Sequence, residues 1–430
     1  MATKMKPSGI EWIGEIPCAW GCEKLKYHAT INPTTDLKAI EFDDDTEVSF
    51  VPMEHLHNGF HDYSSIAFSQ VKRGYTVFSE GDILLAKVTP CFENGNIAIA
   101  EDLIKGVGFG STEILTIRCN SINPSFTYYC LQNPTFKARA VAEMYGVAGL
   151  KRIPPTFIEN SFFPFPSSST QQHIAEYLDQ KCSDIDKIIL AKQRQNELLK
   201  EQRQSIIYEA VTKGLDKQVK YKDSGIEWIG EIPEDWDISK VKYFYETQLG
   251  KMLQPSQKND NETVEKYLCS FNITWDGINQ SEIKEMWFNE REKKIFGIKR
   301  GDLLVLEGGD AGRACICDID FPYYIQNAVH RVRARENAIN KYLYYWLYVL
   351  KAIGYIDLLC NKATIMHFTQ DKMLNIDIPI PPIDVQQHIA DYLDQKCADI
   401  DRIINANNDM IEKLKEYRQS IVYEAVTGKI

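Results

Sequence analysis

The sequence predicts an α+β protein in which two variable α+β domains, related by an internal pseudo-two-fold repeat, are separated by two long helices. Three observations predict this fold class. Residues 171–212 return 215 positions later as residues 386–427, with about 30 of the 42 aligned residues identical. A lead-in segment at residues 4–20 returns at residues 220–236. Between each lead-in segment and the next repeated stretch lie about 150 residues that differ almost completely between the two copies.

The two repeated stretches predict long helices that pack against a partner helix. Neither stretch contains Gly or Pro, and 42 helical residues at about 1.5 Å rise would extend roughly 60 Å. Apolar residues recur at alternating steps of three and four, which is the pattern of a coiled-coil seam. The predicted seam consists of Ile174, Leu178, Ile185, Ile189, Leu199, Ile206, Ile389, Leu393, Ile400, Ile404, Leu414 and Ile421. We expect an intramolecular antiparallel coiled coil, with pairing in a homodimer as the alternative.

In chain order, the repeat divides the sequence into four parts. We expect a first variable domain, a first helix, a second variable domain and a second helix at residues 1–165, 166–215, 216–380 and 381–430. Pro-rich segments precede both helices, and proline disfavours helix in the residue before it, so these segments should be extended boundaries.

The two variable domains share a faint outline. Each has a Gly-Asp turn, at Gly81 and Asp82 or at Gly301 and Asp302, followed by an apolar strand. A polar loop containing glycine, a further strand and an aromatic amphipathic helix follow in both domains. One scaffold that carries different loops is typical of a fold that recognises two different ligands.

Composition restricts the class of protein. No run approaches eighteen apolar residues and the N-terminus lacks the hydrophobic centre of a signal peptide, so we expect a cytoplasmic protein. The eleven cysteines are scattered, which indicates reduced thiols. The net charge of −11 argues mildly against nucleic-acid binding through bulk electrostatics. However, Arg331, Arg333 and Arg335 lie together, and a local basic face can exist on an acidic protein.

Two motifs lead to a family. The lead-in sequence SGIEWIGEIP occurs twice, at residues 8–17 and 224–233, and each long helix starts with QQHIA followed by YLDQKC. This arrangement over the whole chain resembles the specificity subunit of type I restriction–modification systems. The resemblance implies two target recognition domains that each read one half of a bipartite DNA site, on a coiled coil that spaces them.

The resemblance also implies the partners of the chain. These are double-stranded DNA, two methyltransferase (modification) subunits and restriction/translocase subunits, with no membrane. S-adenosylmethionine, ATP and Mg are expected on the partner subunits, and no cofactor, metal or catalytic residue is expected on this chain. The sequence lacks a Walker A motif, which agrees with ATP chemistry on another subunit.

Candidate DNA-contacting residues come from the polar loops of each variable domain. Arg, Asn and Gln can make forked contacts to bases, whereas Lys, Ser and Thr suit phosphates. In the first domain the candidates are Lys87, Thr89, Asn94, Ser111, Thr112, Lys151 and Arg152. In the second domain they are Arg313, Gln326, Asn327, His330, Arg331, Lys362, Thr364 and His367. Arg152 and His367 are 215 positions apart, which predicts equivalent loops that carry different residues.

The sequence leaves two other function classes open. A coiled-coil scaffold whose variable domains bind proteins would suit the acidic pI near 5.4. A self-sufficient methyltransferase is less favoured, because the Asn133-Pro134-Thr135-Phe136 stretch has no glycine-rich cofactor loop upstream of it, and Asn-Pro-Thr is common turn chemistry.

Overall fold

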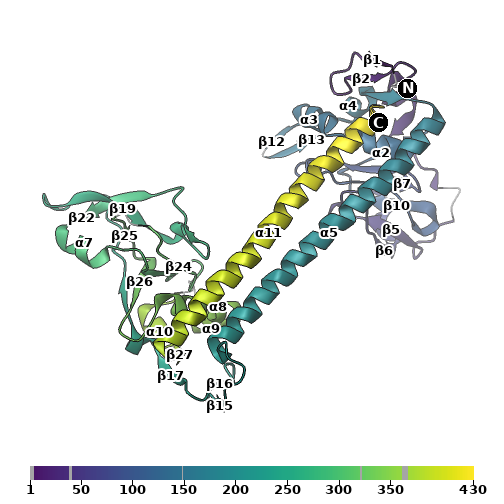
Figure 1. Cartoon of the computed structure of the whole chain (residues 1–430). Helices are drawn as coiled ribbons and strands as arrows, with labels where there is room; N and C mark the ends of the chain where they lie inside the picture. The colour runs from purple at the N-terminus through teal and green to yellow at the C-terminus, as the bar shows by residue number, and fades with distance from the viewer. Residues whose placement is uncertain (1–3, 38–40, 148, 320–321, 361–366) are drawn as a thin grey trace. The chain divides into compact units, whose positions relative to one another are not determined.

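The computed structural model describes residues 4–37, 41–147, 149–319, 322–360 and 367–430 (Figure 1). Internal contacts divide the chain into two compact units. Unit 1 consists of Met1–Lys192 and Asn408–Ile430, and unit 2 consists of Gln193–Asn407. Each unit therefore contains one variable domain and one half of each long helix.

The two repeated stretches form the longest helices, α5 (Ser168–Lys213) and α11 (Ile383–Val426) (Figure 1). Within unit 2 the two helices are antiparallel, because Arg203 Nη1 donates to Asp401 Oδ1 at 2.7 Å while Asn196 contacts Asn407. Within unit 1, Arg418 Nε lies 3.2 Å from Asp186 Oδ1. All twelve predicted seam residues are buried or half-buried. The expected packing of the two helices within one chain is confirmed.

A buried polar layer interrupts the apolar seam in unit 2. The Asn407 side-chain amide donates to Asn196 Oδ1 at 2.8 Å and to Gln195 Oε1 at 3.2 Å. Both asparagines are buried. A buried amide pair of this kind penalises any register in which one amide would face apolar side chains.

Unit 1 contains two four-stranded sheets. The first sheet is mixed and has the order β6 (Ser64–Ala67), β5 (Glu47–Val51), β10 (Val107–Gly110) and β7 (Thr76–Ser79). The second sheet is antiparallel and has the order β4 (Ala29–Ile31), β11 (Ile114–Cys119), β8 (Ile83–Ala86) and β9 (Ile97–Ile99). The two-stranded pairs are β1 (Met5–Pro7) with β2 (Glu15–Pro17), β3 (Gly21–Lys24) with β14 (Phe162–Phe165), and β12 (Tyr145–Val147) with β13 (Leu150–Arg152). The short helices are α1 (Phe68–Val71), α2 (Pro124–Gln132), α3 (Pro134–Ala142) and α4 (Pro155–Asn160).

Unit 2 repeats the antiparallel sheet of unit 1. Its order is β18 (Tyr245–Leu249), β26 (Val329–Ala334), β23 (Leu303–Leu306) and β24 (Ala314–Ile316). A three-stranded sheet has the order β22 (Lys284–Phe288), β19 (Thr263–Leu268) and β25 (Tyr324–Ile325). The two-stranded pairs are β15 (Tyr221–Asp223) with β16 (Glu231–Pro233), β17 (Asp237–Lys240) with β27 (Asp377–Ile380), and β20 (Ile273–Thr274) with β21 (Gly277–Ile278). The helices are α6 (Val241–Phe244), α7 (Glu290–Phe296), α8 (Asn340–Ala352), α9 (Tyr355–Leu359) and α10 (Gln370–Leu374).

The repeated Gly-Asp turns explain why the two antiparallel sheets match. In unit 1, Asp82 accepts the Ser79 backbone N–H and pairs with Arg118 on β11 at 2.7 Å. In unit 2, Asp302 accepts the Lys299 backbone N–H and pairs with Arg333 on β26 at 2.7 Å. In each unit, the aspartate of the Gly-Asp turn therefore both closes the turn and pairs with an arginine of the neighbouring strand.

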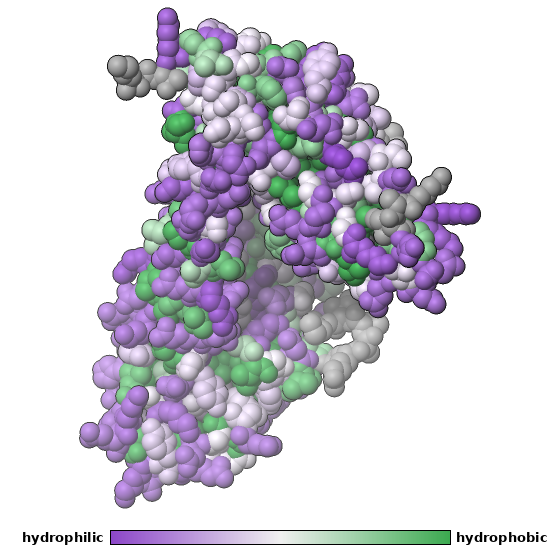
Figure 2. Space-filling view, turned by 90° about the vertical axis from the view of Figure 1, so that its right-hand side faces the viewer, coloured by the Kyte–Doolittle hydropathy of each residue, from purple (hydrophilic) through white to green (hydrophobic). Residues whose placement is uncertain are grey.

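The surface shows no broad apolar region on the face drawn in Figure 2, where hydrophobic residues lie scattered among hydrophilic ones. No helix within the described residues is long and apolar enough to cross a membrane. All eleven cysteines are free thiols.

We expect the buried asparagine pair to behave as a coupled unit. Asn407→Leu alone should lower the free energy of unfolding by about 1–3 kcal/mol, because the Asn196 amide would lose a partner in a buried site. The double variant Asn196→Leu, Asn407→Leu should recover most of this loss, since both buried amides are gone. Urea unfolding followed by circular dichroism measures both effects, and strictly additive losses would contradict the coupling.

Candidate nucleic-acid interface

Six of the seven first-domain candidates lie together in unit 1. The backbone N–H of Lys87 donates to Glu113 O at 3.0 Å, and the N–H of Ile153 donates to Lys87 O at 2.9 Å. The Thr89 hydroxyl donates to Gly149 O at 2.8 Å, and Lys151 N–H donates back to the same hydroxyl. The loop after β8, the turn before β11 and the β12–β13 hairpin therefore form one edge of the domain. Asn94 is exposed in the loop that follows Thr89.

The side chains at this edge include cations and hydroxyls. Lys87 Nζ donates to Thr112 O at 2.6 Å. Arg152 makes a forked contact with Glu113, at 2.9 Å from Nε and 2.8 Å from Nη2, and this hydrogen bonding lowers the pKa of Glu113. Lys151, Arg152 and Thr112 are exposed. The edge can thus offer donors to phosphate or base oxygens.

A hollow of about 320 Å³ lies beside these residues. Lys87 and Thr112 line it together with Asn32 and Thr76. Thr116 also lines it, and its buried hydroxyl has no partner among the described residues. Thr116 lies opposite Leu84 on β8, just as Arg331 lies opposite Leu304 on β23.

The corresponding edge of unit 2 has the same backbone framework. The N–H of Glu307 donates to Ala328 O at 3.0 Å, and the N–H of Phe368 donates to Glu307 O at 2.6 Å. These bonds match those of Lys87 and Ile153 in unit 1. Arg152 and His367 are the residues that directly precede Ile153 and Phe368, so their expected equivalence is confirmed for the backbone.

The side chains on this framework differ between the units. Glu307 takes the place of Lys87, and burial raises the pKa of the Glu307 carboxyl although His367 lies 4.0 Å away. Gln326 and Asn327 are half-buried and hydrogen-bond to each other. Arg313 contacts Asp310 at 3.5 Å and Ser270 O at 3.3 Å. Lys362 and Thr364 lie outside the described residues.

Two second-domain candidates lie in the interior rather than on this edge. His330 is fully buried, and its Nε2 lies 3.2 Å from Phe368 O. Arg331 is also buried, and its guanidinium donates to Ile295 O at 2.8 Å and to Gly297 O. The Arg333 guanidinium donates two hydrogen bonds to the Asp302 carboxylate. The expected basic face and the expected DNA contacts of His330 and Arg331 are therefore not supported by their placement.

The chain matches a family model over most of its length. The model for the type I restriction modification DNA specificity domain matches residues 25–200 and again residues 233–413. The chain belongs to this family. The expected non-catalytic specificity subunit of a type I system is thereby confirmed at the level of the family.

Individual relatives agree with this assignment. The EcoAI specificity subunit of Escherichia coli is 37% identical over 179 residues, which cover 40% of this chain and 30% of that relative. The MjaVIII specificity subunit of Methanocaldococcus jannaschii is 25% identical over 394 residues, covering 89% of this chain and 85% of the relative. The chain thus spans less than a third of the first relative but most of the second.

A solved structure shows the same fold. It comes from work on complex assembly and conformational transition of the type I R-M system. Its chain has a TM-score of 0.74 at 16% identity, with 96% of this chain and 99% of that chain covered. At this identity the likeness concerns the fold alone, and it confirms the expected α+β architecture.

The sequence analysis did not predict the contact that joins each variable domain to the long helices. We call this contact, between a tyrosine of the aromatic helix and an aspartate of a long helix, the junction. In unit 1 the Tyr129 hydroxyl of α2 donates to Asp179 Oδ1 of α5 at 2.7 Å. In unit 2 the Tyr345 hydroxyl of α8 donates to Asp394 Oδ1 of α11 at 2.7 Å. Burial and this bond raise the pKa of Tyr345, so the phenol stays protonated. The signal was present in the sequence as a Tyr-Tyr pair in both aromatic helices.

Each junction also includes an arginine from the opposite long helix. In unit 1, Arg418 of α11 contacts Asp186 of α5 and donates to Gln132 of α2 at 3.2 Å. In unit 2, Arg203 of α5 contacts Asp401 and lies 5.7 Å from the ring centre of Tyr348 on α8. Arg203 and Arg418 are 215 positions apart, and each connects the two long helices to the aromatic helix of its unit, through a hydrogen bond to Gln132 in unit 1 and a ring contact with Tyr348 in unit 2.

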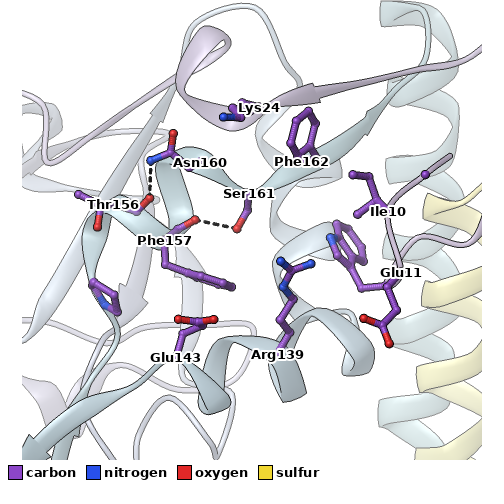
Figure 3. A pocket seen from close by; sticks show the side chains of 13 residues that line it. Ile10, Glu11, Lys24, Arg139, Glu143, Thr156, Phe157, Asn160, Ser161 and Phe162 are labelled. Atoms are coloured by element: carbon purple, nitrogen blue, oxygen red, sulfur yellow. Dashed lines mark hydrogen bonds between the residues drawn. The ribbon is translucent and has the colours of Figure 1, made fainter.

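A cavity of about 620 Å³ lies between the lead-in segment and the variable domain of unit 1 (Figure 3). Ser161 Oγ donates to Phe157 O at 2.7 Å and Asn160 Nδ2 donates to Thr156 O at 2.8 Å. Arg139 of α3 and Glu143, the residue that follows α3, also line it. The charged residues Glu11 and Lys24 also line it.

The burial of His330 predicts a pH dependence of stability. Burial lowers its pKa from 6.5 to about 4, so between these pH values the unfolded chain binds more protons than the folded one. The free energy of unfolding should therefore fall as pH decreases from 6.5 to about 4, and this fall should be shallower in His330→Gln. Chemical unfolding across this pH range measures the difference, with the exposed His367→Gln as control. Parallel profiles for His330→Gln and the unsubstituted chain would contradict the assignment.

Proposed function

We propose that this chain is a sequence-specific DNA-binding subunit that recognises a bipartite site, with one variable domain for each half-site. The target recognition domains would occupy residues 1–165 and 216–380, and the spacer helices residues 166–215 and 381–430. The chain would act in the cytoplasm without catalysing a reaction itself. Two methyltransferase subunits and restriction/translocase subunits would bind S-adenosylmethionine, ATP and Mg.

One observation carries this proposal. The two domains build the same edge from the same backbone hydrogen bonds, yet place Lys87 and Arg152 in one and Glu307 and His367 in the other. A constant frame with different side chains is what reading two different short sequences requires. The same frame would also suit two different protein ligands, so the match to the DNA specificity domain family is what favours DNA over a protein-binding scaffold.

The repeated helices support the choice of partners. Their junction residues and lead-in segments are the same in both units, so each unit offers a similar surface next to a different recognition edge. Two similar surfaces suit two copies of one partner. This supports two modification subunits per chain.

A methylation map of the source genome tests the proposal. Single-molecule sequencing with and without this gene should reveal one split adenine-methylated motif, two short halves around an unread spacer, that disappears when the gene is deleted. An unchanged map together with no co-purifying methyltransferase subunit would contradict the proposal.

Substitutions in the two edges should separate loss of affinity from loss of base preference. Lys151→Ala should weaken binding for all sequences and reduce the salt dependence by about one phosphate contact. Gln326→Ala should instead relax base preference in the second half-site, with a loss of about 1–3 kcal/mol. Binding to duplexes substituted in one half at a time measures both, with Lys413→Ala on α11 as control. An equal effect of both variants on both halves would contradict one domain per half-site.

A further inference from the structure

A short loop beside Gln326 and Asn327 holds two aliphatic side chains in solvent. The loop follows β18 and Gly250 and consists of Lys251, Met252, Leu253 and Gln254. Met252 is 76% exposed and Leu253 is 57% exposed, whereas Lys251 and Gln254 on either side are 7% and 6% exposed. Isolated exposed apolar residues are common, but two adjacent ones between buried polar residues call for an explanation.

The first end of the loop is anchored through Lys251. Its backbone N–H donates to Ile325 O at 2.8 Å, and its ammonium donates to Trp287 O at 2.7 Å and to Glu292. The ammonium also lies 4.9 Å from the ring centre of Phe288. A buried ammonium with these partners fixes the position of the residue that follows it.

The second end is anchored through Gln254. Its side-chain amide donates to Glu262 Oε2 at 2.9 Å, and its backbone carbonyl accepts the backbone N–H of Trp287 at 3.2 Å. The same Glu262 oxygen accepts the Lys258 N–H at 2.7 Å. Because both ends are held by buried hydrogen bonds, the outward position of Met252 and Leu253 is built into the loop.

The loop lies directly against the amide pair of the recognition edge. A Cβ on Gly250 would lie 2.4 Å from Gln326 O and 2.5 Å from Ile325 O, so only glycine allows this approach. The Asn327 N–H donates to Lys251 O at 2.9 Å. The backbone of this loop therefore lies directly against the backbone of Gln326 and Asn327, which places Met252 and Leu253 close in the fold to the two amide residues.

This combination matches the major-groove edge of an A·T pair. Asn and Gln side chains can bond adenine N6 and N7, and the thymine of the same pair presents a methyl group beside them. We propose that Met252 and Leu253 contact a thymine 5-methyl group in the second half-site, next to an adenine read by Gln326 or Asn327. The inference rests on the proposed function and adds an apolar contact and a base identity to it.

Replacement of thymine by deoxyuridine tests this directly, since it removes only the methyl group. The measurement uses the complex of this chain with its modification subunits and duplexes that carry the mapped site. Deoxyuridine at one position of the second half-site should weaken binding about four-fold, the effect of losing the burial of one methyl-sized group. The same replacement in the first half-site measures the response of the other domain.

A matched pair of variants links the effect to the loop. Met252→Ser combined with Leu253→Ser should bind thymine and deoxyuridine duplexes equally, because the apolar contact is gone. Leu358→Ser on α9 removes a leucine that is 63% exposed and should keep the four-fold discrimination.

Several outcomes would overturn the inference. These are a second half-site without an A·T pair, unchanged affinity for every deoxyuridine duplex, or full discrimination by the double variant. If the double variant loses affinity but no duplex shows a methyl effect, the loop acts on DNA by another contact, such as insertion between bases, and the inference is wrong. If the complex does not bind the mapped site, the proposed function fails together with it, whereas sequence-specific binding without a methyl effect refutes the inference alone.

Discussion

The junction between each variable domain and the helix pair is the interaction on which the rest of the structure depends. A tyrosine hydroxyl of the aromatic helix donates to an aspartate of one long helix, and an arginine of the other long helix forms an ion pair with a second aspartate nearby. Because three elements meet at these groups, the domain cannot turn on the helices without breaking charged hydrogen bonds in a partly buried site. Under the proposed function, the edge that contacts DNA would need a fixed position relative to the helices, and this junction supplies it.

In the interior of the two domains, equivalent positions of the antiparallel sheets carry different residues. The position opposite Leu84 on the unit 1 sheet is Thr116, and the position opposite Leu304 on the unit 2 sheet is Arg331. The arginine fills its interior site and bonds two backbone carbonyls, whereas the threonine leaves a hollow next to Lys87 and Thr112. The two domains can therefore diverge inside as well as at the edge, provided that the Asp82–Arg118 and Asp302–Arg333 pairs keep the strands in register.

The sequence predicted the repeat and the long helices well, because heptad spacing and identity between copies are local properties of the chain. It could not predict that Arg331 is buried, since that depends on the carbonyls of α7, more than thirty residues earlier in the chain. It also gave no sign that Met252 and Leu253 are exposed, because an apolar pair after a strand normally indicates core. Their exposure follows from the bonds of Lys251 and Gln254 to Trp287, Glu292 and Glu262, which only the folded chain brings together.

The net charge of −11 reflects an excess of Asp and Glu over Lys and Arg, and several of the arginines are in addition paired inside the fold. Arg118, Arg203, Arg333 and Arg418 each contact a carboxylate within their own unit, so they hold the fold together and contribute little to an external positive field. Under the proposed function, sequence-independent attraction to phosphates would then depend on the exposed cations that remain at the edges, such as Lys151, and base recognition would depend mainly on amide, hydroxyl and apolar contacts. Such a division would allow the recognition edges to change sequence preference without altering the attraction to DNA as a whole.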